Sequence, residues 1–482
     1  MSYSYPYETP FNRGEIFKFS RLTVIWLSII FGAVWAACFL VGVAIPFWID
    51  NGLIIDGAIN WFSKFSESPS DANLIWSNTF RALTPIVAVA VFIPINAMFM
   101  VLCERRALAL FTVRKGPNRV GPDGLLQTAA DAVKLLFKED ITPRGADILL
   151  FTLAPIIFFA PSIIGMVPLL AAVTNNHQLF SMVNIPTGIF YVIAVSAIPV
   201  VGIVMGGWAS NNKYSLVGGL RSAAQAISYE IPLVLSIITV CLISGTLDVV
   251  SIAERQAGGL LNWNIFAGGA LPQASSHLAA ALENLRTMST DVTEATRQAA
   301  WASVNQAWGG MVAAFVLVGC LFTLFGIYAT CACAEINRIP FDLPEAESEL
   351  VSGYNTEYSG IKFAIFFLAE FTNLFVVSSI ATVLFLGGGS SPIQGFLDAQ
   401  WWNWLVSVNS WKLPGLPFIN PETFFGAFWV IVKVYSLVIF AILVRGTLPR
   451  FRIDQLMDFG WKRLIPLSLI LLLAVTFLRE LV

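Results

Sequence analysis

The chain has 482 residues, of which 57% are hydrophobic and only 12% are charged, and its formal net charge is −2. A soluble domain this apolar would aggregate, so the composition indicates a membrane protein with several spans, and the near-neutral charge argues against binding of nucleic acid. All six cysteines lie inside apolar runs, which argues against the disulfide framework of a secreted protein.

Nine apolar runs are long enough to cross a bilayer, which takes about 20 residues. They lie at residues 22–48, 83–103, 148–173, 186–208, 223–245, 311–334, 361–386, 424–444 and 464–478. The first run is too long for a signal peptide and lacks a cleavage site, so we expect it to be retained. The pattern predicts an all-α fold, a polytopic transmembrane helical bundle of about nine spans.

The distribution of basic residues predicts the orientation of these spans. The connection at residues 105–147 holds eight lysines and arginines, and the later alternate connections are also basic near the spans. By the positive-inside rule the N-terminus is cytoplasmic and the C-terminus lies outside. Two outer connections, 51–77 and 248–308, are long, and we expect them to form solvated caps or partner contacts. The part at 278–308 has a helical composition.

Three ionisable residues lie inside predicted spans, where an unpaired charge costs several kcal/mol. Glu230 precedes Pro232 by two residues, Glu370 lies two to three turns into its span, and Lys433 lies twelve residues before Arg445. They are interpreted either as a paired polar knot that fixes helix packing or as a titratable chain that leads inward.

The first basic connection contains two further features. Glu104 is followed directly by Arg105 and Arg106, which suggests a local ion pair. After Gly121, apolar residues recur at helical spacing between charged ones, which predicts an amphipathic helix on the membrane surface. This helix is either a basic anchor at the membrane interface or a lipid-facing gate for an amphiphilic ligand.

A short loop after the sixth run is strongly acidic. Its six carboxylates are Glu335, Asp342, Glu345, Glu347, Glu349 and Glu357. Like charges held close together cannot all ionise, so we expect some of these groups to hold protons at neutral pH. The alternative is a solvated acidic face. Cys331 and Cys333 form a pair without further partners, so no metal site is expected.

Several segments together resemble one family, the H subunit of bacterial NADH:quinone oxidoreductase, respiratory complex I. They are ERR at 104–106, GPNRVGP at 116–122, GWASNNKYSL at 207–216, SYE at 228–230, EINRIPFDLPEAESEL at 335–350 and TLPR at 447–450. The resemblance runs from residue 83 to the C-terminus and divides the chain into an additional N-terminal part, 1–82, and a membrane domain, 83–482. The segments 248–308 and 401–421 depart from the family.

The resemblance implies a subunit that forms part of the quinone-binding chamber and couples quinone reduction to proton translocation. It implies a proton relay through Glu104, Glu230, Asp342, Glu345, Glu347, Glu349, Glu357, Glu370 and Lys433. It implies quinone contacts at Arg105, Arg114, Gly116, Phe341 and Asp342. The family holds no NADH, flavin or cluster itself; quinone, either ubiquinone or menaquinone, is its substrate. Its partners are other complex I subunits in the cell inner membrane.

Three alternatives remain open from the sequence. An anchor subunit of a related membrane-bound hydrogenase or formate complex would share part of the resemblance. A stand-alone ion transporter should show inverted repeats and a midplane substrate site, and the sequence shows no such repeat. A purely structural anchor would keep the same loops without titrating groups.

Overall fold

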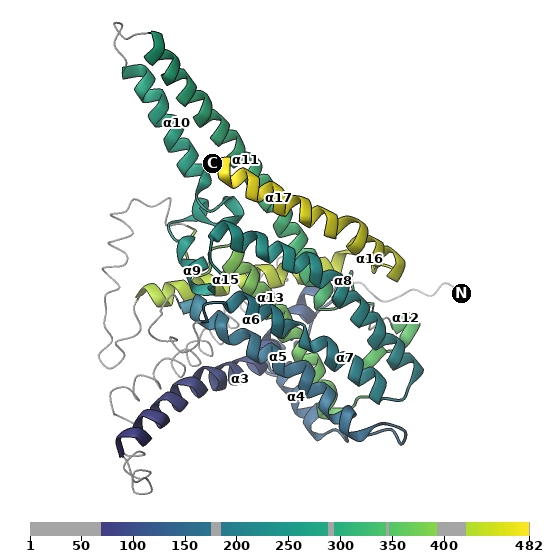
Figure 1. Cartoon of the computed structure of the whole chain (residues 1–482). Coiled ribbons are helices and arrows are strands. Elements are labelled where there is room, and N and C mark those ends of the chain that lie inside the picture. The colour runs from purple at the N-terminus through teal and green to yellow at the C-terminus, as the bar shows by residue number, and fades with distance from the viewer. Residues whose placement is uncertain (1–68, 175–184, 288–293, 344–346, 393–420, 482) are drawn as a thin grey trace.

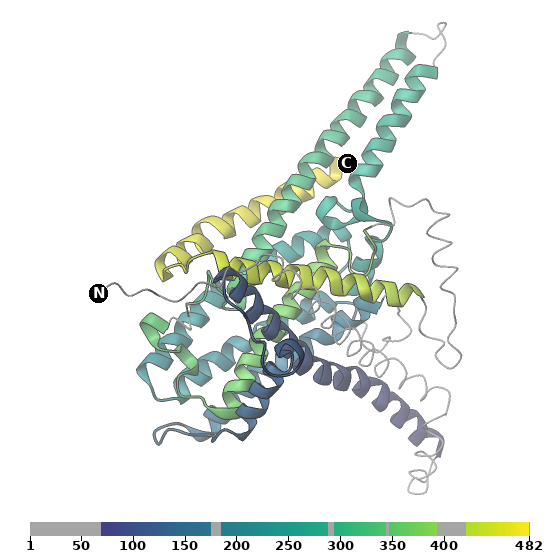
Figure 2. The same ribbon diagram turned by 180° about the vertical axis from the view of Figure 1, so that it is seen from behind.

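The computed structural model describes residues 69–174, 185–287, 294–343, 347–392 and 421–481, and every regular element in these ranges is helical. The long helices are α3 (Pro69–Phe111), α5 (Ile148–Thr174), α8 (Lys213–Ser244), α10 (Ala270–Thr287), α11 (Glu294–Glu335), α13 (Gly360–Phe385), α15 (Pro421–Thr447) and α17 (Ile465–Leu481). The shorter helices are α4 (Gln127–Phe137), α6 (Gly188–Ser196), α7 (Ile198–Ala209), α9 (Val249–Arg255), α12 (Glu347–Leu350) and α16 (Ile453–Phe459). Figures 1 and 2 show a bundle from which one helical hairpin projects.

The helices confirm the all-α membrane bundle. Within the described residues, 7 helical segments are long and apolar enough to cross a membrane, and each covers one of the predicted spans from residue 148 onward. Helix α3 contains the predicted span at 83–103, but it begins at Pro69, inside the predicted outer connection 51–77. The predicted span at 22–48 lies outside the described residues, so the count of nine and the orientation stay predictions.

Glycines bring three of the spans into close contact. A Cβ atom added to Gly202 of α7 would lie 2.8 Å from the backbone nitrogen of Phe158 in α5. One added to Gly207 would lie 2.7 Å from the carbonyl oxygen of Ser215 in α8. Small residues let membrane helices approach backbone to backbone, where van der Waals packing holds them together. Helices α5, α7 and α8 therefore form a tight layer.

The loops that carry the sequence motifs meet at one end of the bundle. This motif end comprises residues 104–147, 209–213, 335–343, 347–360 and 445–463. The backbone N–H of Ile141 donates to the hydroxyl of Ser359 at 2.9 Å, and the N–H of Phe451 donates to the carbonyl of Pro340 at 3.1 Å. The predicted gathering of these loops on one side is therefore confirmed, although which side faces the cytoplasm stays a prediction.

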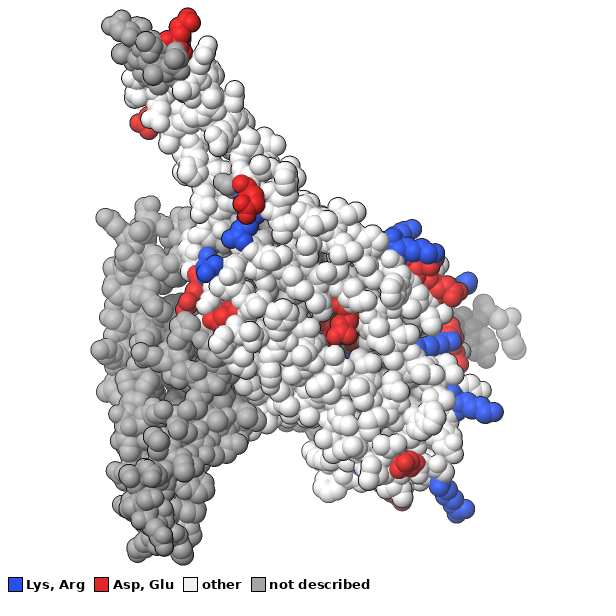
Figure 3. All heavy atoms as spheres, viewed as in Figure 1, with Lys and Arg blue, Asp and Glu red and all other residues white. Residues whose placement is uncertain are grey.

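The opposite end, called the far end here, comprises residues 244–270 and 386–391. The amide of Gln256 donates to the carbonyl of Val383 at 2.9 Å, and the amide of Asn264 donates to the carbonyl of Leu384 at 2.7 Å. Figure 3 shows charged side chains near the two ends of one face and, between them, a mostly uncharged band that carries one acidic patch near its centre. This distribution is typical of a protein whose middle faces lipid.

The predicted helical part of the connection 248–308 is confirmed. Helix α10 and the first turns of α11 form the hairpin that leaves the bundle (Figure 1). A seam of small and branched side chains is buried in this hairpin: Ala274, Leu278, Ala281, Ala300 and Val304. A Cβ atom added to Gly310 of α11 would lie 3.7 Å from the carbonyl oxygen of Leu481, so the last turn of α17 lies at the base of the hairpin.

Candidate functional site

A cavity of about 70 Å³ lies between α5, α6, α7, α8, α11 and α13. It extends along α8 from Ser222 to Ile237, a rise of about 22 Å at 1.5 Å per residue. Its wall is mostly apolar, and the polar exceptions are Ser162, Ser196, Ser222, Glu230, Glu335, Asn337 and Asn373. A space of this size accommodates about two water molecules, provided that polar groups bind them.

Two carboxylates from different helices face this cavity. Glu230 lies in the middle of α8, and Glu335 is the last residue of α11. Both side chains are partly buried, and they are close enough for their charges to repel each other. The cavity wall therefore presents two acidic groups, one near the motif end and one deeper in the bundle.

Sequence reasoning placed Glu335 in the acidic loop but did not include it among the relay residues. The signal was present, because Glu335 directly follows the apolar run 311–334 and so ends a membrane helix. What the sequence lacked was the pairing of α8 with α11, which brings Glu335 to the cavity that Glu230 also lines.

Glu370 lies beside the cavity, not on its wall. Its carboxylate is buried and accepts a hydrogen bond from the hydroxyl of Tyr354 at 3.0 Å. Asn373, about one turn further along α13, does line the cavity and accepts a hydrogen bond from Ser162. The hydroxyl of Tyr354 therefore links Glu370 to segment 347–360 of the motif end.

The structure does not bring Lys433 together with Glu230 and Glu370. The ammonium of Lys433 donates to the carbonyl of Leu386 at 2.6 Å, at the far end of α13. Leu386 follows Glu370 by sixteen residues, which is about 24 Å along a helix. The three residues predicted to form an inward chain therefore lie at different depths, and only Glu230 lines the cavity.

Glu104 is clamped by two arginines from distant parts of the chain. Its Oε2 lies 2.6 Å from Nη1 of Arg338, and its Oε1 accepts a hydrogen bond from Arg445. The prediction of an ion pair with the two following arginines is wrong. Arg105 instead pairs with Asp131, and Arg106 donates to a backbone carbonyl in the loop before α4. Asp131 of the surface helix α4 therefore binds Arg105, one of the two arginines that were expected to pair with Glu104.

Three carboxylates of the acidic loop each have a partner of their own. Asp342 lies 2.8 Å from Arg450, Glu349 lies 2.6 Å from Arg221, and Glu357 accepts from the amide of Asn212 at 2.7 Å. Each partner comes from a different place in the fold. Proximity in the sequence therefore does not make these three acids a single charge cluster.

The remaining acids of this loop are less fully described. Glu345 lies outside the described residues. Glu347 begins the short helix α12, but its side chain is not among those described. A proton relay role for Glu345 and Glu347 stays a prediction.

The predicted quinone contacts occupy two kinds of surroundings. Arg105 and Arg114 are exposed, and Gly116 lies against α3, where an added Cβ atom would be 3.1 Å from Cγ of Arg106. Phe341 is buried, with its ring 5.5 Å from that of Tyr229. The arginines and Gly116 are therefore accessible to a ligand, whereas Phe341 supports the loop from beneath.

The predicted amphipathic helix is confirmed as α4. Its apolar side chains Val133, Leu136 and Phe137 are exposed, and Phe137 is 87% exposed. Exposed apolar residues with interleaved lysines are typical of a helix that lies in the membrane interface. Among the described residues, no group of three or more His, Cys, Asp and Glu side chains could hold a metal ion.

Comparison with known proteins identifies relatives over most of the chain. The family model described as NADH dehydrogenase matches residues 84–476. The chain is 38% identical over 398 residues to a protein from Koribacter versatilis (strain Ellin345) that is named as a second H subunit of NADH-quinone oxidoreductase. That alignment covers 80% of this chain and 92% of the relative. The residues matched by the family model include the two carboxylates of the cavity and the clamp at Glu104.

Proposed function

The chain belongs to the NADH dehydrogenase family and is a membrane subunit of NADH-quinone oxidoreductase, respiratory complex I, and on this premise we propose that its cavity couples quinone reduction to proton movement. Quinone, either ubiquinone or menaquinone, is the substrate of the assembly, and the redox groups belong to its other subunits. We place the assembly in the cell inner membrane, with the quinone-site subunits of the peripheral arm at the motif end and small membrane subunits beside the bundle.

The quinone enters along α4 and reaches the motif end. The exposed apolar side of α4 suits a lipid-soluble ligand, and Arg114 and Gly116 lie in the loop before it. Arg105 ties α4 to α3 through Asp131, so the position of the entrance is fixed by an ion pair. Electrons arrive from a neighbouring subunit, and the head group is reduced above the acidic loop.

Reduction creates negative charge in a poorly hydrated chamber, where Coulomb interactions far exceed those in water. Asp342, Glu349 and Glu357 surround this end of the bundle and respond to the new charge by changing how strongly they hold their partners. Gln225 joins the loop to the cavity, because its amide donates to the carbonyls of Ala334 at 2.7 Å and Phe341 at 2.6 Å. A shift of the loop therefore moves the end of α11 that carries Glu335.

Glu335 and Glu230 then pass the response deeper into the bundle. Because their charges repel, binding of a proton by one carboxylate makes it easier for the other to lose its proton. Water held by the serines and asparagines of the cavity wall connects the two groups. The single observation that carries the proposal is that acids from α8 and α11 line one cavity beneath the acidic loop.

The proposal is tested in the assembled complex, reconstituted in liposomes, with the variants Glu230→Gln and Glu335→Gln. Glutamine fills the same space but does not accept and release a proton. We expect proton pumping per quinone reduced to fall on the order of a hundredfold in each variant, since a positioned proton-transfer group contributes at least that much. Glu283→Gln, on the exposed surface of α10, is the matched control and should pump normally.

The same experiment separates coupling from a purely structural role. If both cavity variants assemble and pump like the wild type, the chain is an anchor and the proposal fails. If they are assembled in normal amount and reduce quinone without pumping, the cavity carboxylates carry the coupling.

A further inference from the structure

The far end of the bundle contains a buried cation that the proposed coupling does not use. The ammonium of Lys433 donates to three backbone carbonyls, those of Leu386 at 2.6 Å, Gly388 at 2.9 Å and Ser390 at 2.7 Å. Its Nζ also lies 4.1 Å from the centre of the Trp263 ring. The indole N–H of Trp263 donates to the hydroxyl of Ser390 at 2.8 Å, which holds the ring in place.

This geometry requires the charged form of the lysine. A protonated ammonium has three N–H donors, which matches the three carbonyl oxygens, whereas a neutral amine has only two. Loss of the proton would leave one carbonyl without a donor and turn a lone pair toward the oxygens, and a buried polar group left without a partner is costly. A cation over an aromatic face adds a further attraction that disappears with the charge. These contacts therefore stabilise Lys433 in its charged form.

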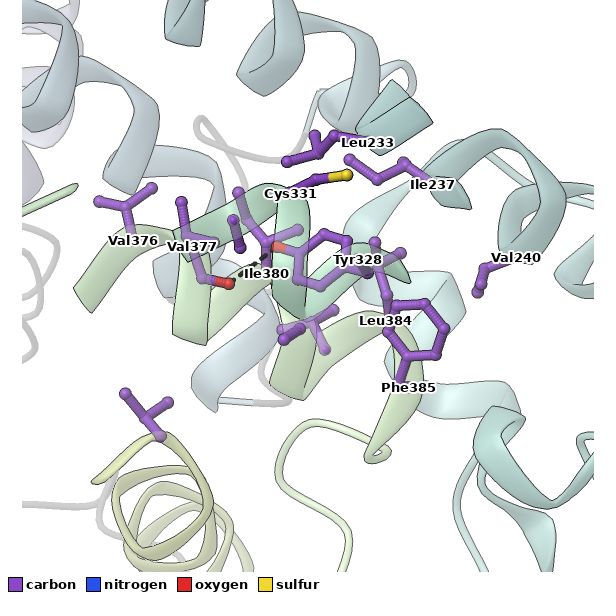
Figure 4. Packing of buried hydrophobic residues seen from close by; sticks show 14 of the residues in the cluster. Leu233, Ile237, Val240, Tyr328, Cys331, Val376, Val377, Ile380, Leu384 and Phe385 are labelled. Carbon is purple, nitrogen blue, oxygen red and sulfur yellow. Dashed lines mark hydrogen bonds between the residues drawn. The ribbon is translucent and has the colours of Figure 1, made fainter. Parts of the chain in front are cut away.

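An apolar plug separates this charge from the cavity. Beyond Ile237 and Ile380, the last cavity-lining residues of α8 and α13, the described helices place Val240, Leu384 and Phe385, all of which are fully buried. Figure 4 shows Leu384 and Phe385 beside Tyr328, and the rings of Tyr328 and Phe385 lie 5.5 Å apart. The hydroxyl of Tyr328 donates to the carbonyl of Val377 at 2.9 Å. Leu386 follows Ile380 by six residues, so the charge lies about 9 Å beyond the end of the cavity.

We propose that Lys433 is an electrostatic seal, which together with this plug prevents protons in the cavity from leaving through the far end of the chain. A fixed cation placed beyond a narrow apolar segment raises the energy of any proton that enters it, as positive charges do in pores that exclude protons. The inference rests on the proposed function for the presence of protons in the cavity, but the seal itself is a property of the resting protein. It also explains why a lysine that no carboxylate neutralises in the described structure is kept inside the membrane.

The test measures passive proton leak, without NADH or quinone. The complex is reconstituted in liposomes, a pH gradient is imposed, and its decay is followed with an entrapped pH dye for the wild type, Lys433→Met and Lys433→Arg. Removal of a unit charge about 10 Å away should raise the leak about tenfold at an effective dielectric constant of 20. The arginine variant keeps the charge and should leak like the wild type.

Each other outcome overturns the seal. If Lys433→Met leaks protons no faster than the wild type, the charge is not needed. If Lys433→Arg leaks as fast as Lys433→Met, only the packing of the lysine matters. Lys433→Gln, which keeps two N–H donors, replaces Lys433→Met if that variant does not assemble. Failure of both neutral variants to assemble, with a normal arginine variant, would assign the lysine to folding alone. Glu283→Gln, on the exposed surface of α10, should hold the gradient like the wild type. Because the leak is measured without NADH or quinone, failure of the coupling proposal stays distinguishable from failure of the seal.

Discussion

Oε2 of Glu104 lies 2.6 Å from Nη1 of Arg338, and both side chains are less than 10% exposed. Arg445 binds the other carboxylate oxygen, so one acid joins α3, the loop after α11 and the end of α15. The guanidinium of Arg338 also stacks on the ring of Phe371 in α13, with Cζ 4.2 Å from its centre. This clamp fixes the position of the acidic loop relative to the spans that line the cavity.

Replacing Glu104 with Gln should destabilise the protein by about 3 kcal/mol, because it leaves the buried guanidinium of Arg338 without this counter-charge. We expect less assembled complex and a lower melting temperature, both measured on the purified complex. Arg221→Gln removes the exposed pair with Glu349 and should cost less than about 1 kcal/mol. Equal losses in the two variants would contradict a special role for the buried clamp.

The contact between α5 and α7 gives a second prediction. Gly202→Ala places a Cβ atom 2.8 Å from the nitrogen and 3.1 Å from the Cα atom of Phe158, so the helices must separate. Overpacking of this kind costs about 1–3 kcal/mol and should lower the melting temperature. Gly319 of α11 has no atom within 4 Å of an added Cβ, so Gly319→Ala is the control and should be as stable as the wild type. An unchanged melting temperature for Gly202→Ala would mean that the helices do not pack this closely.

The exposed side of α4 gives a third prediction. Phe137→Asp places a charge where an apolar ring is 87% exposed, which should detach the end of the helix from the lipid and impede quinone entry. We expect the KM for a long-tailed quinone to rise about tenfold, which corresponds to the loss of one aromatic side chain's contact with the apolar lipid. The KM for a short, water-soluble quinone should not change, and Lys134→Gln on the same helix is the control. A similar rise with both quinones would place the effect on the reaction site instead of the entrance.

The periodicity of the sequence predicted the helices well because lipid imposes one rule on every span. The apolar runs at 148–173 and 361–386 lie within one residue of α5 and α13. The prediction was weakest for α11, which begins at Glu294, seventeen residues before the predicted start at 311. Its first turns pack against α10, and the apolar run alone does not encode that pairing.

The candidate site depended on tertiary pairings that no spacing encodes. Glu104 and its true partner Arg338 are far apart in the chain, so the neighbouring arginines were the natural but incorrect choice. The sequence shows both Lys433 and Glu370 only as charged residues inside apolar runs. In the structure Lys433 lies at the far end, whereas Glu370 lies beside the motif end. Only residue types and their burial within spans could be predicted; which groups share a cavity follows from how α8, α11 and α13 pack.

The central claim is that Glu335 and Glu230 change protonation when quinone is reduced. The most direct measurement is redox-induced infrared difference spectroscopy of the assembled complex, in which a carboxyl group that gains or loses a proton produces a C=O stretching band. We expect such a band in the wild type, its loss or reduction in Glu335→Gln and in Glu230→Gln, and no change in the control Glu283→Gln. A carboxyl band that is identical in the wild type and in both cavity variants would contradict the central claim.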